Sequence, residues 1–174
     1  IDIDAFYVNW SGAAITNTPV VKLNTTTTIN SDAPDPSVNG QDYTVTVTVS
    51  AISGTPTGTV SVSDGLGGTC SITLAGGIGN CDLHSTIIGA KTITASYGGD
   101  TNYNSSSTTT GHTVSKANSA VTITSDTPDP SVTGESYAVD VSVAAVAPGT
   151  GTPTGSVTVS DGTANCSITL AGGT

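Results

Sequence analysis

Residues 32–40 read DAPDPSVNG and residues 126–134 read DTPDPSVTG, so one motif occurs twice in the chain with an offset of 94 positions. An offset of this size is the length of one β-sandwich domain, and it is much longer than the roughly 20 to 50 residues of a solenoid repeat. The sequence therefore predicts tandem modules, which we name module 1 (residues 24–117) and module 2 (residues 118–174).

Comparison of the two copies separates the buried face of a strand from its exposed face. Residues 44–49 read TVTVTV and correspond to residues 138–143, which read AVDVSV. Every Val is kept, whereas every intervening residue changes. Because successive side chains of a strand point to opposite faces, the Val row is predicted to be buried and the row that contains Asp140 to be exposed.

Short alternating segments with turns between them predict an all-β fold of tandem immunoglobulin-like Greek-key β-sandwiches. No segment has the pattern of a helix. A three-residue insertion in module 2, near Pro148–Thr150, is expected to lie in a loop because loops tolerate length changes. The strands expected in module 1 are residues 25–30, 43–51, 59–63, 70–74, 80–85, 91–97 and 106–115.

The composition excludes several partners. The chain has a formal net charge of −10 with only three Lys and Arg residues. Nucleic acid and anionic membrane surfaces are therefore excluded, because both depend on clustered positive charge. No apolar run approaches the roughly 20 residues that span a bilayer, and no charged leader precedes an apolar stretch.

Two of the three cysteines, Cys70 and Cys81, flank a segment with the pattern of two strands around a glycine-rich turn. A two-residue turn at Ala75-Gly76 would place these cysteines opposite each other across a hairpin. The expected cross-strand disulfide contributes about 3 kcal/mol and implies an oxidising compartment. Two buried free thiols are the alternative, and a zinc site would need four suitably spaced ligands. Cys166 corresponds to Cys70, and its partner is expected beyond Thr174.

Three motifs resemble the bacterial Ig-like repeat domains that occur in tandem in large surface proteins. They are PTGTVSVSDG at residues 56–65, GAKTITASY at residues 89–97 and GDTNYNSS at residues 99–106. The resemblance covers residues 25–117 and part of module 2. It implies a spacer, stalk or display role and no catalytic residues. Unlike antibody domains, the modules lack a core Trp, and their cysteines are expected in one hairpin.

Residues 1–23 differ from the repeats. The alternating segment Ile1–Val8 is followed by Trp10, and residues 17–19 have the composition of a linker. We expect the end of a preceding β domain followed by a linker. The alternative is a strand that extends module 1.

Candidate chemistry is sparse. His84 and His112 belong to no metal-binding or nucleophile motif, so we expect both to face solvent on their strands and predict that the protein is not an enzyme.

Acidic residues recur at the turns. Asp32 and Asp35 have the counterparts Asp126 and Asp129, and Asp100 lies between the last two strands of module 1. Carboxylates at a module junction are ligands that calcium prefers, so one hypothesis is a calcium site formed by Asp100, Asp126 and Asp129. No Asp-x-Asp-x-Asp-Gly loop is present, and Asp before Pro is an ordinary turn former. Solvated turns are therefore the alternative, and no other cofactor is expected.

Two functions fit these features. The first is a structural spacer, stalk or filament component of a larger extracellular or cell-surface protein. The second is an adhesin-type module that binds a glycan or a protein. Module 2 has no counterpart of residues 79–117 of module 1 within this sequence. We therefore expect an incomplete second sandwich, completed by the continuing chain or by a neighbouring copy of the protein.

Overall fold

The computed structural model describes residues 20–173, and these residues form strands but no helix. No segment among them qualifies as a membrane-spanning helix. The strands are β1 (Thr25–Ala33), β2 (Ser37–Val38), β3 (Asp42–Ala51), β4 (Thr59–Ser63), β5 (Thr69–Thr73), β6 (Ile78–His84), β7 (Gly89–Tyr97), β8 (Ser106–Ser115), β9 (Ser119–Thr127), β10 (Ala138–Ala145), β11 (Ser156–Ser160) and β12 (Asn165–Thr169). The expected N-terminal strand, Ile1–Val8, lies outside the described residues.

Module 1 is a sandwich of two sheets. One has the order β1-β3-β6 and the other the order β2-β8-β7-β4-β5. The expected strands are confirmed, and the short β2, which pairs in parallel with β8, is additional. The two sheets enclose one apolar core made of Tyr43, Val45, Val47, Val49, Val60, Val62, Ile72, Leu74, Leu83, Ile93, Ala95, Tyr97 and Tyr103.

The alternating Val residues of β3 face this core, as the repeat comparison predicted. Val45, Val47 and Val49 are at most 1% exposed. The pairing of β1 with β3 is interrupted by a bulge that leaves Asn30 unpaired. The pairing of β9 with β10 is interrupted in the same way at Thr124, the counterpart of Asn30. The two modules therefore share a strand register as well as a sequence motif.

The disulfide between Cys70 and Cys81 is present, with the two Cα atoms 6.1 Å apart. The expectation that it crosses one hairpin was wrong, because β5 and β6 belong to different sheets. The tight turn is formed by Gly76 and Gly77, which have φ angles of 66° and 80°, and only Ala75 and Ile78 pair across it. Beyond this turn the strands separate to opposite sides of the core, so the disulfide joins the two sheets.

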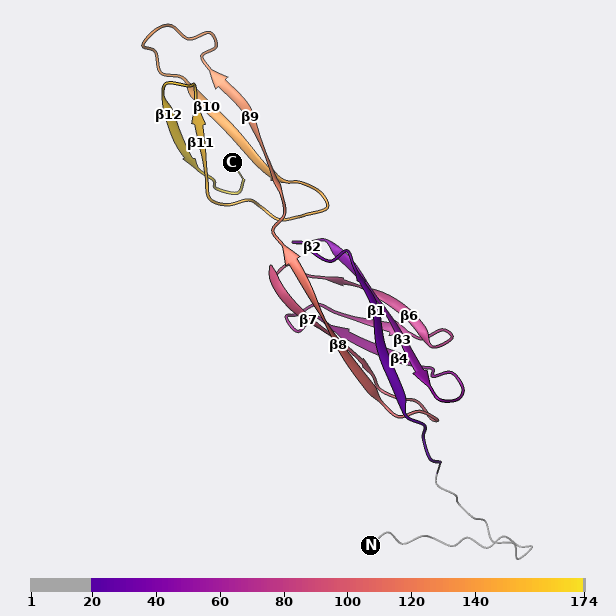
Figure 1. Cartoon of the computed structure of the whole chain (residues 1–174). Coiled ribbons are helices and arrows are strands. Elements are labelled where there is room, and N and C mark those ends of the chain that lie inside the picture. The colour runs from indigo at the N-terminus through magenta and orange to yellow at the C-terminus, as the bar shows by residue number, and fades with distance from the viewer. Residues whose placement is uncertain (1–19, 174) are drawn as a thin grey trace, which may run out of the picture.

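Module 2 contains two pairs of strands in the described residues, β9 with β10 and β11 with β12. Figure 1 shows module 2 beyond module 1, with the connection from β8 to β9 between them. Val141 and Val143 are 5% and 7% exposed. The buried Val row of module 1 is thus partly reproduced in module 2.

Candidate functional site

The end of module 1 that adjoins module 2 holds a group of buried polar side chains. His112 on β8 is fully buried and stacks on the ring of Tyr43, with 3.8 Å between the ring centroids. One ring nitrogen contacts Ser37 Oγ at 2.9 Å, and the other contacts Asp32 Oδ2 at 3.0 Å. The expectation that His112 faces solvent was therefore wrong.

The reason lies in the register of β8. The side chains of His112 and Val114 both point toward the core, whereas Thr113 between them is exposed. The short strand β2 pairs with β8 at this position. His84, by contrast, faces solvent as predicted and contacts Asp42 at 2.7 Å.

Asp64 is the second buried group at this end. Its carboxylate accepts hydrogen bonds from the N–H groups of Leu66 and Gly68, each at 2.8 Å, and from Ser85 Oγ at 2.6 Å. Burial alone would raise the pKa of Asp64. These hydrogen bonds, together with the positive charge of Lys91, lower the pKa of Asp64 below its usual value. Asp64 thus fixes the turn between β4 and β5 as a buried anion.

Lys91 is buried on β7, and its Nζ makes no direct hydrogen bond in the structure. It lines a hollow of about 240 Å³ together with Asp64, Ser85 and His84. Sequence reasoning missed both Lys91 and Asp64. Their burial could have been predicted from the alternation of side chains along a strand. Lys91 is two positions from the buried Ile93, and Asp64 is two positions from the buried Val62, so each points to the same face as its neighbour.

Asp32, Asp35 and His112 form the one group in residues 20–173 whose ligand atoms are close enough to hold a metal ion, all within 4.8 Å. Hydrogen bonds within the protein are sufficient to explain why these three side chains lie close together. Asp32 and Ser37 occupy the two ring nitrogens, and Asp35 accepts a hydrogen bond from the Thr113 N–H at 2.9 Å. We therefore interpret the group as a structural lock between the motif at residues 32–40 and β8.

The proposed calcium ligands Asp100, Asp126 and Asp129 form no such group in the described part of the chain. Asp100 lies in the turn between β7 and β8, at the end of module 1 where Leu23 pairs with Tyr103. Asp126 lies on β9, paired with Val139. Asp100 and Asp129 lie in connections between strands, whereas Asp126 lies on β9. The sequence could not tell which end of a module each residue occupies.

We expect chelation to leave the melting temperature of module 1 unchanged, because an apolar core and a disulfide hold the sandwich together. The measurement is thermal unfolding of the chain with and without EDTA. A lower melting temperature in EDTA that calcium restores would contradict this prediction.

Asp100 fastens its turn through both carboxylate oxygens. Oδ2 accepts from the N–H and hydroxyl groups of Thr57 at 3.0 and 2.8 Å, and Oδ1 accepts from the N–H groups of Asn102 and Tyr103. Desolvation raises the pKa of this carboxyl, but the hydrogen bonds outweigh it and lower the pKa to about 2.

Because the folded pKa of Asp100 lies below its unfolded value, its stabilising effect is complete above pH 4 and is lost as the pH falls through about 2. An NMR titration is therefore expected to show the Asp100 carboxyl still ionised at pH 3, with the Thr57 amide signal unchanged. Protonation with a midpoint near 4 would contradict this prediction.

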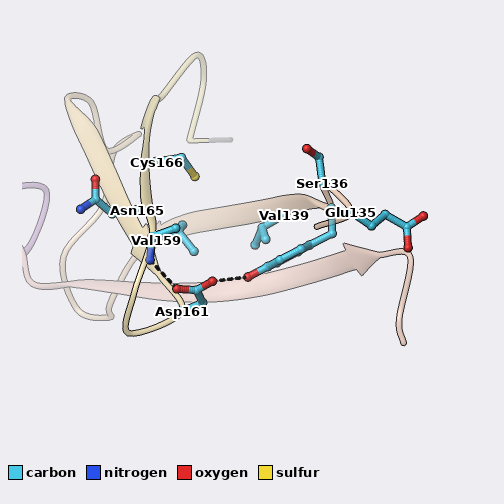
Figure 2. A pocket seen from close by; sticks show the side chains of 9 residues that line it. Glu135, Ser136, Val139, Val159, Asp161, Asn165 and Cys166 are labelled. Carbon is cyan, nitrogen blue, oxygen red and sulfur yellow. Dashed lines mark hydrogen bonds between the residues drawn. The ribbon is translucent and has the colours of Figure 1, made fainter. Parts of the chain in front are cut away.

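A hollow of about 330 Å³ lies in module 2. Figure 2 shows Val139, Val159, Asp161 and Cys166 around it. Tyr137 also lines the hollow, and its hydroxyl donates to Asp161 at 3.3 Å. The module 1 counterparts of these residues are Tyr43, Val45, Val62, Asp64 and Cys70, which lie in or against its core. The hollow in module 2 therefore lies where module 1 has its apolar core, which β6, β7 and β8 help to enclose.

Cys166 is free and exposed in the described structure, unlike its counterpart Cys70. Asp161 keeps the role of Asp64 as a turn anchor. The N–H group of Ala164, followed by the N–H and hydroxyl groups of Thr163, donates to its carboxylate, and these hydrogen bonds lower the pKa of Asp161 to about 2. The two modules thus use the same turn chemistry with different degrees of burial.

The facing sheets of module 1, with connections that cross between them, define an immunoglobulin-like β-sandwich. A family model, bacterial Ig-like domain (group 3), matches residues 29–115, and the chain belongs to this family. The resemblance inferred from the three sequence motifs is confirmed. No curated protein and no solved structure matches the chain. The family consists of non-catalytic modules typical of surface proteins.

Proposed function

We propose that this chain is a spacer or stalk segment of an extracellular, cell-surface protein, in which each Ig-like module adds length. The observation that carries the proposal is that the chain enters and leaves module 1 at opposite ends. Thr25, at the start of β1, contacts Ser106 at the start of β8, and β2 pairs in parallel with the end of β8. A strand of ten residues such as β8 spans about 33 Å, so module 1 extends the chain by about that distance.

The compartment follows from the chemistry of the chain. A disulfide that joins two sheets is stable where thiols are oxidised, which favours the cell exterior. A net charge of −10 keeps such an array soluble and discourages association with anionic surfaces.

Within module 1, the position of the aromatic side chains favours a spacer role over glycan binding. Tyr43, Tyr97 and Tyr103 are at most 7% exposed, and each hydroxyl group has a hydrogen-bond partner within the module. They are therefore not available as stacking platforms for sugar rings.

The partners under this proposal are neighbouring modules or copies of the same protein. Within the described residues, β10 pairs with β9 and β11 with β12, whereas their counterparts β3 and β4 each have a second partner, β6 and β7. A strand resembling β6 would pair with β10 and could bring a cysteine to Cys166. The continuing chain or a second copy could supply it.

Module replacement in the native protein tests the proposal. Exchanging residues 24–117 for an unrelated sandwich of the same length should preserve function, and deleting them should reduce the reach of the protein by one module. Loss of function after a length-matched exchange would instead support a specific binding role for module 1.

A further inference from the structure

The inserted residues of module 2 lie at the junction between the modules. The loop from β10 to β11 covers residues 146–155, whereas its counterpart from β3 to β4 covers residues 52–58, three residues fewer. The later part of the loop packs alike in both modules. Leu170 N–H donates to Gly155 O at the end of this loop at 2.9 Å, as Leu74 N–H donates to Gly58 O in module 1 at 2.9 Å. The extra residues are thus an addition to an otherwise preserved loop.

These extra residues contact module 1 and the connection from β8 to β9 (residues 116–118). Thr150 N–H donates to the backbone oxygen of Asn39 at 3.0 Å, and the Asn39 side-chain amide donates back to Thr150 O at 3.2 Å. Gly149 is buried against Ala117, in the connection from β8 to β9, so closely that a Cβ at position 149 would overlap the Ala117 side chain. A hydrogen bond from Val146 N–H to Asn118 O at 2.8 Å also joins the loop to this connection.

The surface on module 1 that contacts the loop is held in place by hydrogen bonds within module 1. Asn39 N–H donates to Ser115 O on β8 at 2.9 Å, and Gly40 N–H donates to Ser85 O at 3.1 Å. Gly40 has a φ of +76°, and a Cβ there would overlap Thr150 Oγ1. Glycine therefore serves both the turn and the close approach of the loop.

We propose that residues 148–150 form a junction clamp that docks on Asn39 and Gly40 and holds the two modules at a fixed angle. The clamp deepens the proposed spacer function, because a stalk with restrained junctions projects farther than a flexible string of the same length. Module 1 carries the shorter loop, so a clamp of this design is specific to the junction with module 2. Module 2 carries Thr133 at the position of Asn39, and threonine lacks the amide donor.

The test measures hydrogen exchange of the Thr150 amide in the full chain, because that N–H group is protected only while the clamp is closed. The Asn39→Thr variant removes one side-chain hydrogen bond and should accelerate this exchange roughly fivefold. The matched control, Asn102→Thr at the opposite end of module 1, should leave the rate unchanged. Deletion of residues 148–150 should make the rotational correlation times of the modules, measured by ¹⁵N relaxation, diverge.

Three results would overturn the proposal: unprotected exchange of Thr150 in the parent chain, equal rates in the Asn39→Thr and Asn102→Thr variants, or correlation times that the deletion does not change. The melting temperature of module 1 shows whether the Asn39→Thr and Asn102→Thr variants are folded, and the dispersion of the module 2 amide signals shows the same for the deletion variant. The hydrogen-exchange measurement is made on the purified chain, and the module replacement is made in cells. The clamp can therefore be refuted while the spacer function is supported, and the reverse also holds.

Discussion

Replacing both Cys70 and Cys81 by serine is expected to lower the free energy of unfolding of module 1 by about 3 kcal/mol. The disulfide closes a short loop, with a sequence separation of 11, and it ties the two sheets together at one edge. For a module of this size the loss corresponds to a decrease in melting temperature of roughly 10 to 20 °C. Thermal unfolding of the oxidised protein and of the double variant measures the effect.

Cys166→Ser is the matched control, because Cys166 is free and exposed in the described structure, and it should leave the module 1 transition unchanged. Peptide mapping without reduction should recover Cys70 and Cys81 in one linked pair. Finding both thiols alkylated without prior reduction would refute the prediction and remove a main argument for an extracellular location.

Asp64→Ala is expected to destabilise module 1 by about 2 to 4 kcal/mol. The substitution removes the acceptor of the Leu66, Gly68 and Ser85 hydrogen bonds at a buried position, and it leaves the charge of Lys91 without its nearby anion. Asp161→Ala, in the exposed counterpart turn, should not affect the module 1 transition. A loss below about 0.5 kcal/mol for Asp64→Ala, the range of ordinary surface substitutions, would contradict this account.

Asp64 also predicts the direction of a pH effect. Because its pKa is lower in the folded module than the usual 3.8, its contribution is complete above that value and decreases as the pH falls through the folded pKa. Module 1 should therefore lose stability in acid, and the Asp64→Ala variant should lose less over the same range. Denaturant unfolding at a series of pH values compares the two proteins.

Much of the fold could be predicted because the chain contains two copies of one pattern. The Val residues of β3 and β10 are the same in both copies while their neighbours differ, which identified the buried face directly. The family motifs confirmed the sandwich. Strand order could not be read from this alternation, since a strand shows the same pattern in either sheet. The inference of a hairpin disulfide failed for that reason.

The polar end of module 1 was predicted less well. Histidine and lysine are usually exposed, so His112 and Lys91 were not expected in the core despite their inward register. Their burial depends on partners far away in sequence, such as Asp32 for His112. The grouping of Asp100 with Asp126 and Asp129 failed because a position in sequence does not specify an end of the module. The insertion at residues 148–150 was detected, but only the structure connects it with Asn39.

Limited trypsin digestion of intact cells that display the native protein tests whether module 1 is a self-contained domain on the cell surface. Trypsin has three target residues in this chain, because it contains no arginine and only Lys22, Lys91 and Lys116. Lys22 and Lys116 are exposed at the two ends of module 1, whereas Lys91 is only 4% exposed. A surface array of self-contained modules predicts release of residues 23–116 as one resistant fragment. Cleavage after Lys91 under native conditions, or protection of both exposed lysines until the cells are lysed, would contradict the account.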